Sequence, residues 1–170
     1  MNIEDIARHY ITAPAYEVPS SVIKNFRQFI IDLAQVELQG IDFKYVDFDP
    51  YYRGAELCLE DIRADYNQGK MMISTQFNNS ELLGPDVNMI FRCIHEIHHI
   101  KLNVDFGWTG ESATARYIMS LTNNLLFKQI LFSESIGQVS VRLDQGEFLE
   151  HQKIVLFPEE VIQDFEFRYN

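Results

Sequence analysis

The sequence predicts a mainly α protein of the α+β class, a helical domain with a small β element in its first half. Apolar residues recur at helical spacing after residue 20 and through most of the second half, whereas short alternating runs occur only before residue 76. With 170 residues, of which 46% are hydrophobic, the chain can bury a sizeable core. We therefore expect a single domain over residues 1–170, with residues 1–19 forming either an N-terminal arm or a short helix and a loop.

A long helix is expected first, beginning at Ser20 or Ser21 and running to about Leu38. A serine can cap a helix at its start, and Gly40 is suited to end it. The apolar residues between follow a helical stripe: Val22, Phe26, Phe29, Ile30, Leu33 and Val36.

Two short strands are expected next. Apolar and polar residues alternate from Ile41 to Phe48, and Met71–Thr75 follows a turn signal at Asn67–Gly69. Residues 55–66 fit neither period cleanly, so this segment could be a helix or a strand.

The second half is expected to be mostly helical. Gly84-Pro85 precedes Asp86, which can cap a helix that finishes at residues 101–103. A loop at residues 102–110 holds the only tryptophan. Three more helices should follow: one from Glu111 with Ala115, Ile118, Leu121, Leu125 and Leu126 on its apolar side, one at Glu134–Leu143 after a break near Ser133, and one at Glu159–Phe165 after Pro158.

The composition limits which partners and which cellular compartment we expect. The 25 acidic residues outnumber the 14 basic ones and give a net charge of −11, so we expect no nucleic acid and no anionic membrane as partner. Two cysteines predict no disulfide framework, and the sequence shows neither a signal peptide nor an 18-residue apolar run. We expect a cytoplasmic protein. A homo-oligomer is left open, because Tyr10 and Tyr16 could pack on a neighbour or on their own core.

The strongest chemical motif is His95-Glu96-x-x-His99, which lies in the helix predicted after Pro85. Residues i and i+4 lie about 40° apart around a helix axis, so both imidazoles can reach one metal ion. Glu111 begins the following helix and is the candidate third ligand, separated from His99 by 11 residues. This separation is shorter than in most zinc peptidases with two histidines and one glutamate. It therefore argues against that class while leaving a divalent metal site, with zinc favoured and iron as the alternative.

Glu96 admits three interpretations. In a metal-dependent hydrolase it would be the general base that activates water. In a carboxylate-bridged di-iron bundle Glu96-x-x-His99 would itself supply ligands, but such sites need two of these pairs and the sequence shows one. Otherwise Glu96 is a solvated surface carboxylate.

The neighbouring candidates also have structural alternatives. His98 is expected to be packed or hydrogen-bonded rather than a ligand. Glu111 could instead be a first-turn carboxylate that the helix dipole favours. Glu134 and Gln138 share a helix face and could line the same pocket, with Gly137 between them allowing another backbone to approach closely; equally, they could form a polar surface face.

Other chemistries leave less trace in the sequence. It contains no GxGxxG or phosphate-loop glycine pattern and no GxSxG elbow. Cys93 and His95 are two residues apart, which points their side chains away from each other on a helix. A cysteine nucleophile is therefore not expected there.

Four short motifs follow one another along residues 71–158: Phe91-Arg92…His95-Glu96…His99, Asp105-Phe106…Gly110-Glu111, Glu134…Gly137-Gln138 and Gln152-Lys153…Phe157-Pro158. This ordered series resembles a group of uncharacterised phage-encoded and bacterial proteins, although the last motif of that group reads Leu-Pro. The resemblance implies that His95, Glu96, His99, Glu111, Glu134 and Gln138 form one cluster. It implies no activity.

Three functional hypotheses remain. The leading one is a metal-dependent hydrolase with His95, His99 and Glu111 as ligands and Glu96 as base. The second is a noncatalytic phage-related or regulatory protein whose His/Glu cluster is structural or vestigial. The third is a non-haem iron enzyme with two histidines and one carboxylate on one face of the metal.

Overall fold

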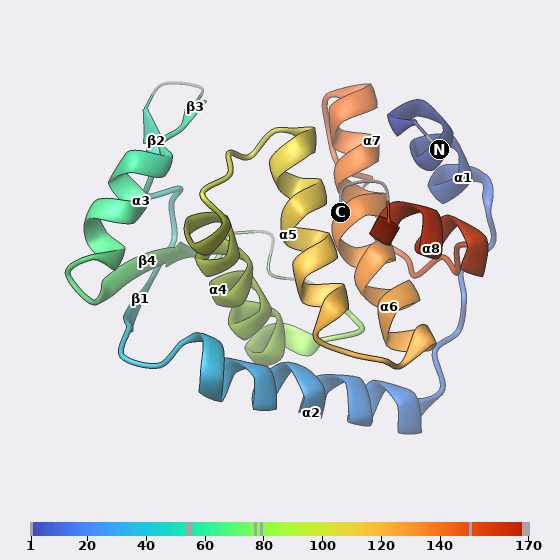
Figure 1. Cartoon of the computed structure of the whole chain (residues 1–170), viewed down its shortest axis with the longest axis horizontal. Coiled ribbons are helices and arrows are strands. Elements are labelled where there is room, and N and C mark those ends of the chain that lie inside the picture. Colours follow the sequence, from blue (N-terminus) through green and yellow to red (C-terminus); the bar gives the residue numbers. More distant parts are fainter. Residues whose placement is uncertain (1, 54–55, 77, 79, 150, 168–170) are drawn as a thin grey trace. The chain divides into compact units, whose positions relative to one another are not determined.

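The computed structural model describes residues 2–53, 56–76, 78, 80–149 and 151–167. The chain divides into two compact units, one of residues up to Val18 together with those from Phe106 on, and one of Pro19–Asp105. The described part is mainly helical with a small β element in its first half, as the sequence predicts (Figure 1). A single domain over all residues stays a prediction.

Two long helices organise the unit of residues 19–105. Helix α2 (Ser20–Glu37) packs against α4 (Gly84–Leu102), which carries the histidine motif. The apolar stripe of α2 buries Phe26 and Ile30. Gly40, with φ of +81°, follows the end of α2, as predicted.

Both predicted helix caps in this unit are wrong. Pro19 holds the N-cap position of α2 with no side-chain cap, so Ser20 is already helical. Leu83 holds the N-cap position of α4, and Pro85 and Asp86 lie in its first turn. A proline ring fixes φ near the helical value, so a helix can begin beside it without a capping side chain.

The β element is a pair of two-stranded sheets. Strand β1 (Asp42–Val46) pairs in parallel with β4 (Lys70–Ser74), and β2 (Tyr52–Arg53) pairs antiparallel with β3 (Glu56–Leu57). Helix α3 (Leu59–Tyr66) completes the crossover that a parallel pair requires. The ambiguous segment therefore contains both a strand and a helix. Ile73 of β4 forms a core with Met89 and Cys93 of α4, and Phe43 of β1 packs against it.

In the residues that the structure describes, the other unit has helices as its only regular secondary structure. It comprises α1 (Ile3–Thr12), α5 (Trp108–Ser120), α6 (Leu125–Phe132), the π-helical segment η1 (Ser133–Gly137), α7 (Gln138–Gln145) and α8 (Glu159–Phe167). Helix α1 packs against α7 and buries Ile6, Ala7 and Tyr10. The Tyr10 hydroxyl donates to the Lys153 carbonyl at 2.8 Å. Residues 3–12 therefore form a short helix, which is one of the two alternatives predicted for residues 1–19.

Three predicted boundaries in this unit need correction. Helix α5 begins at Trp108 rather than Glu111, so the preceding loop is shorter. The predicted helix through Leu126 ends at Ser120, because Asn124 caps a new helix by accepting from the Leu126 and Phe127 N–H groups. The expected break near Ser133 is a π-helical turn through which the backbone stays helical. Pro158 precedes the last helix as predicted, and Gly146 follows the end of α7.

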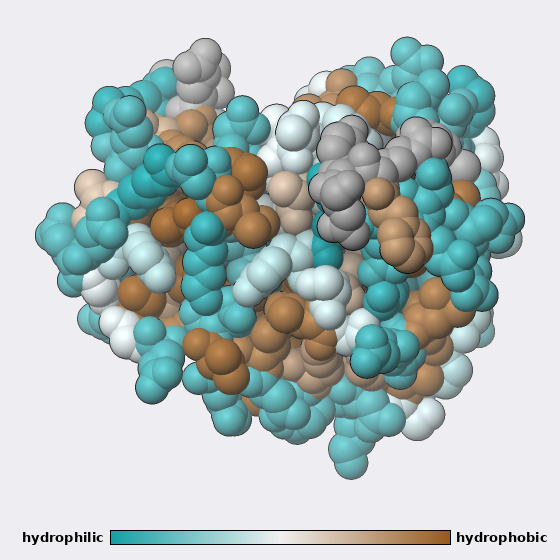
Figure 2. Space-filling view, viewed as in Figure 1, coloured by the Kyte–Doolittle hydropathy of each residue, from teal (hydrophilic) through white to brown (hydrophobic). Residues whose placement is uncertain are grey.

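Hydrophilic side chains cover much of the face in Figure 2, with hydrophobic ones among them. Val36 and Phe167 are the most exposed of the large apolar residues that the structure describes, at 70% and 71%. Among the described helices, none has the length and apolar content needed to cross a membrane.

Candidate metal centre

The side chains of His95 and His99 meet on α4. Their Nε2 atoms are 3.1 Å apart, and the two rings lie nearly perpendicular at 78°. If both nitrogens bound one ion at about 2.05 Å, this separation would correspond to an N–metal–N angle of about 98°. That angle lies between the octahedral and tetrahedral values. In the absence of an ion, the same distance also suits an N–H···N hydrogen bond between the rings.

The C-terminal turn of α4 orients His99. Asn103 adopts the left-handed conformation with φ of 56°, which asparagine tolerates at a helix end, and the Val104 N–H donates to the His99 carbonyl at 3.1 Å. This turn places the Val104 carbonyl 3.4 Å from His99 Nδ1. A proton on Nδ1, donated to that carbonyl, leaves the Nε2 lone pair available. Ligating histidines commonly have such a backbone partner.

Glu111 is the third member of the group. It is 6% exposed and lies in the first turn of α5, where its N–H donates to the Gly107 carbonyl at 2.9 Å. Together with Glu111, the two imidazoles make a set of three residues that could hold a metal ion. The donor set, two imidazoles and one carboxylate, suits a divalent transition metal.

Glu96 lies beside this group and is not a member of it. Its side chain is half-buried, and its charge contributes to raised pKa values at two neighbours in the same unit. The pKa of Tyr51 rises to about 12, mainly by burial and partly through Asp65 and Glu96. Burial likewise raises the pKa of Cys93 to about 12, with Glu96 adding to the effect. Glu96 is therefore a carboxylate next to the candidate ligands, as a general base would be, rather than one of the three.

His98 faces a different partner. It is 1% exposed, and its Nε2 lies 3.2 Å from Glu37 Oε2 of α2, which also accepts from Lys101 Nζ at 2.7 Å. Burial lowers the pKa of His98 to about 4, so the ring is neutral at pH 7 and donates to Glu37. Burial opposes ionisation of Glu37, but the hydrogen bonds from Lys101 and His98 and the positive charge of Lys101 prevail and lower its pKa. His98 thus ties α4 to α2, as expected of a packed histidine.

Glu134 and Gln138 gather around Tyr10 in the helical unit. An added Cβ at Gly137 would lie 2.5 Å from Tyr10 Cδ2, so the glycine permits the close approach of a side chain rather than of the backbone that the sequence suggested. Burial raises the pKa of Glu134 to about 7, and Gln138 acts in the opposite direction. Burial raises the pKa of Tyr10 to about 12, with Glu134 contributing. Neither Glu134 nor Gln138 belongs to the three-residue group, and the single cluster implied by the resemblance stays a prediction.

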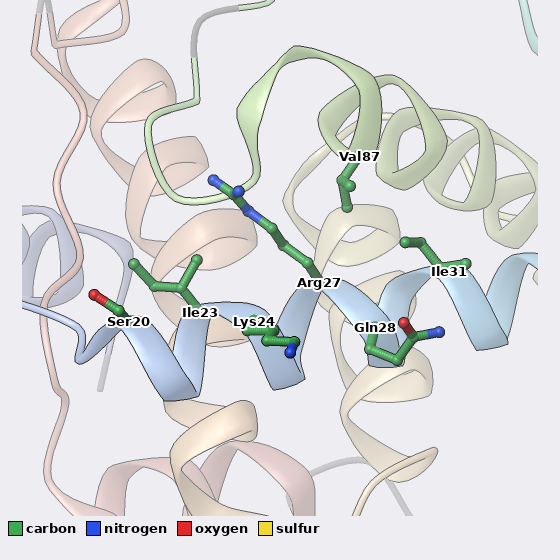
Figure 3. Close-up of a pocket in the computed structure, with 7 residues that line it drawn as sticks. All are labelled: Ser20, Ile23, Lys24, Arg27, Gln28, Ile31 and Val87. Carbon is green, nitrogen blue, oxygen red and sulfur yellow. The ribbon is translucent and has the colours of Figure 1, made fainter.

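A groove of about 500 Å³ on α2 contains none of these residues (Figure 3). Ile23, Lys24, Arg27 and Gln28 line it, together with Ser20, Ile31 and Val87. Arg27 Nε donates to the Leu82 carbonyl at 2.8 Å, which engages the guanidinium in the fold. The groove offers no imidazole or carboxylate and is not a metal site.

Sequence reasoning missed the partners of the candidate residues. The left-handed turn at Asn103 carries a local signal, since asparagine favours that conformation, and could have pointed to Val104. Glu37, Tyr51 and Tyr10 are distant in sequence from the residues they approach, and no local pattern identifies them. Comparison of the chain with protein-family models, curated proteins and solved structures gives no match.

Proposed function

We propose that the protein binds one divalent metal ion through His95, His99 and Glu111 and acts as a metal-dependent hydrolase. The observation that carries this proposal is the 3.1 Å separation of the two Nε2 atoms, with His99 Nδ1 facing a backbone carbonyl. Three protein ligands leave a coordination position open, which is typical of catalytic rather than structural zinc sites. A zinc ion held there would supply activation of water and polarisation of the scissile group.

Glu96 provides the proton transfer that hydrolysis requires. Its carboxylate is next to His95 in the chain and outside the ligand group, so it stays free of metal coordination. In the reaction Glu96 accepts a proton from the attacking water and returns it to the leaving group. A general base of this kind contributes roughly 10²- to 10⁴-fold to the rate.

Zinc is favoured over iron because Glu96, a carboxylate outside the ligand set, can act directly as the general base of a hydrolysis. Two histidines and one carboxylate also match the facial triad of non-haem iron enzymes, which is the alternative. The metal found in the protein decides between these two.

The test is elemental analysis of protein purified without chelators, followed by kinetics on the variant Glu96→Gln. We expect about one zinc per chain in both proteins, together with loss of turnover in the variant by at least about 10²-fold. Iron in place of zinc would favour oxygen chemistry. Absence of stoichiometric metal from the wild-type protein would contradict the proposal, and full turnover by the variant would contradict the role of Glu96.

A further inference from the structure

The hydrogen-bond pattern of the parallel sheet shows which residues of β1 face away from β4. Asp42 N–H donates to the Gly69 carbonyl at 2.8 Å, and Thr75 N–H donates to the Val46 carbonyl at 2.7 Å. Alternate residues of a strand direct both main-chain groups to the same neighbour, so the even-numbered residues of β1 face β4. The odd-numbered residues therefore direct their main-chain groups to the opposite edge.

That edge of β1 has no strand beside it. The sheet contains β1 and β4 only, and in the described part of the chain no hydrogen bond involves the main-chain N–H or C=O of Phe43 or Tyr45. The carbonyl of Ile41, directly before β1, likewise accepts no hydrogen bond from the described residues, whereas its N–H donates to the Leu38 carbonyl at 3.3 Å. An edge with unpaired main-chain groups is a template for another strand.

The outer edge of β4 differs. The Met72 N–H, which points away from β1, donates to the Tyr51 hydroxyl at 2.8 Å. Tyr51 is buried and so caps this edge from within the fold. Of the two strands, β1 is therefore the one with an edge open to a further strand.

The open strand carries one charge of each sign. Asp42 and Lys44 are both exposed, and because they are two residues apart they lie on the same face of the sheet. Neither forms an ion pair with another described residue. Phe43, between them, packs against the core on the other face.

A second copy of β1 fits this edge in one antiparallel register. A closed dimer is two-fold symmetric, so the two β1 strands run antiparallel about a central residue. When that residue is Phe43, Asp42 of each copy lies directly opposite Lys44 of the other copy. Both charge pairs occupy positions without main-chain hydrogen bonds, where opposed side chains are closest.

The same register uses the open main-chain groups. The two Phe43 residues exchange two hydrogen bonds, and the Tyr45 N–H of each copy donates to the Ile41 carbonyl of the other, which adds two more. Tyr45, whose side chain is 51% exposed, then lies opposite Ile41 of the other copy. Aromatic and β-branched residues form favourable pairs across strands, so this contact adds to the stability of the pairing.

The neighbouring registers are less favourable. Centring the pairing on Lys44 sets the two lysines opposite each other, and like charges in that position are destabilising. Centring it on Tyr45 sets Lys44 opposite Val46, which leaves the charge without a partner. The order of Asp42 and Lys44 about Phe43 is therefore complementary to itself, and this favours a second copy of the chain as the occupant.

We propose that β1 is the interface of a homodimer in which the β1 strands of two copies pair antiparallel, centred on Phe43. The two β1–β4 pairs would then form one four-stranded sheet. This pairing needs no metal and is independent of the proposed hydrolase activity. It buries a short edge only, so we expect a weak dimer with a Kd on the order of 100 µM.

The first experiment is sedimentation velocity on the full chain between about 10 µM and 1 mM, repeated with a chelator so that zinc-bridged association is removed. We expect a shift from monomer to dimer over this range in both conditions. A protein that stays monomeric at 1 mM, or that associates only without the chelator, would overturn the inference.

The second experiment reverses each charge in turn. Asp42→Lys and Lys44→Asp each convert two attractive pairs into two repulsive ones, so either variant alone should dimerise about tenfold more weakly, or weaker still. Mixing the two variants restores two attractive pairs and should give a heterodimer with an affinity near that of the wild-type homodimer. Glu4→Lys, at an exposed residue of α1, changes the net charge as Asp42→Lys does and should not weaken the wild-type dimer.

Unchanged dimerisation of the two single variants, or no association in their mixture, would overturn the proposed register. If either variant does not fold, as judged by circular dichroism, residue-resolved amide exchange on the wild-type protein decides. The Phe43 and Tyr45 amides should exchange about fourfold more slowly at 1 mM than at 10 µM, whereas the Lys44 and Val46 amides, which face β4, should change little. Equal exchange of the Phe43 and Tyr45 amides at both concentrations would overturn the inference.

Discussion

At the scale of single residues, the metal proposal depends most on His99. Its ring is fully buried, its Nδ1 faces the Val104 carbonyl and its Nε2 faces His95. Because Nδ1 of this buried ring already faces the carbonyl, Nε2 is the nitrogen that can bind a metal ion. The turn at Asn103, which positions that carbonyl, therefore also orients the candidate ligand.

Replacing His99 with Ala should abolish zinc binding, weakening affinity by at least about 10²-fold, since loss of even an outer-shell partner costs 10- to 100-fold. The matched control is His151→Ala, which removes an exposed histidine outside the group. Calorimetric titration with zinc of both variants is the measurement. If the His99 variant bound zinc with the affinity of the wild-type protein, His99 would be ruled out as a ligand.

At the scale of helices, the contact between α1 and η1 depends on a missing side chain. The Tyr10 ring occupies the space that a Cβ of Gly137 would need. The π-helical segment and α1 can approach this closely only because residue 137 is glycine.

Gly137→Ala should therefore destabilise the protein by roughly 1–3 kcal/mol, the usual cost of overpacking a core. Chemical denaturation measures this change in unfolding free energy. In a Tyr10→Ala background the same substitution should cost markedly less, because the ring that the methyl group meets is gone. Equal costs in both backgrounds would show that the contact with Tyr10 is not responsible.

The helix boundaries show what sequence patterns can and cannot predict. Strands β1 and β4, helices α2 and α4 and the last helix lie where apolar spacing and the Gly and Pro signals predict them. The predicted serine and aspartate caps failed because proline alone can begin a helix. The predicted helix from Glu111 through Leu126 failed because the cap at Asn124 interrupts an otherwise continuous apolar pattern.

At the scale of the whole molecule, Glu134 links stability to pH. Its pKa is raised to about 7 by burial, above the usual value near 4.5. Between these two values the folded protein holds a proton that the unfolded chain has lost. Stability therefore falls as the pH rises from about 4.5 to 7 and then levels off.

Replacing Glu134 with Gln should remove this dependence and stabilise the protein at pH 8 by roughly 1–3 kcal/mol, with little effect at pH 4. Urea unfolding of both proteins across this pH range is the measurement. Glu166→Gln, at a carboxylate paired with Lys128 on α6, serves as the control and should not remove the dependence. Parallel stability curves for the wild-type and Glu134→Gln proteins would contradict the burial effect.

Metal binding should also appear as a global stabilisation. Zinc at a hundred times its dissociation constant should add about 2.7 kcal/mol to the free energy of unfolding. Thermal unfolding with zinc, and again after a chelator, measures the change. The increase should be absent from the His99→Ala variant, and an equal increase there would point to zinc bound elsewhere.

The sequence by itself determined the helical class, the two-strand element and the presence of His95 and His99 on one face of one helix. These features follow from the spacing of residues that are close in the sequence, because local backbone geometry sets the direction in which each side chain points. Only the tertiary structure decided that His98 binds Glu37 and that Tyr10 lies over Gly137. Each of these contacts joins segments that are distant in the chain, and no local sequence pattern indicates which distant segments will pack against each other.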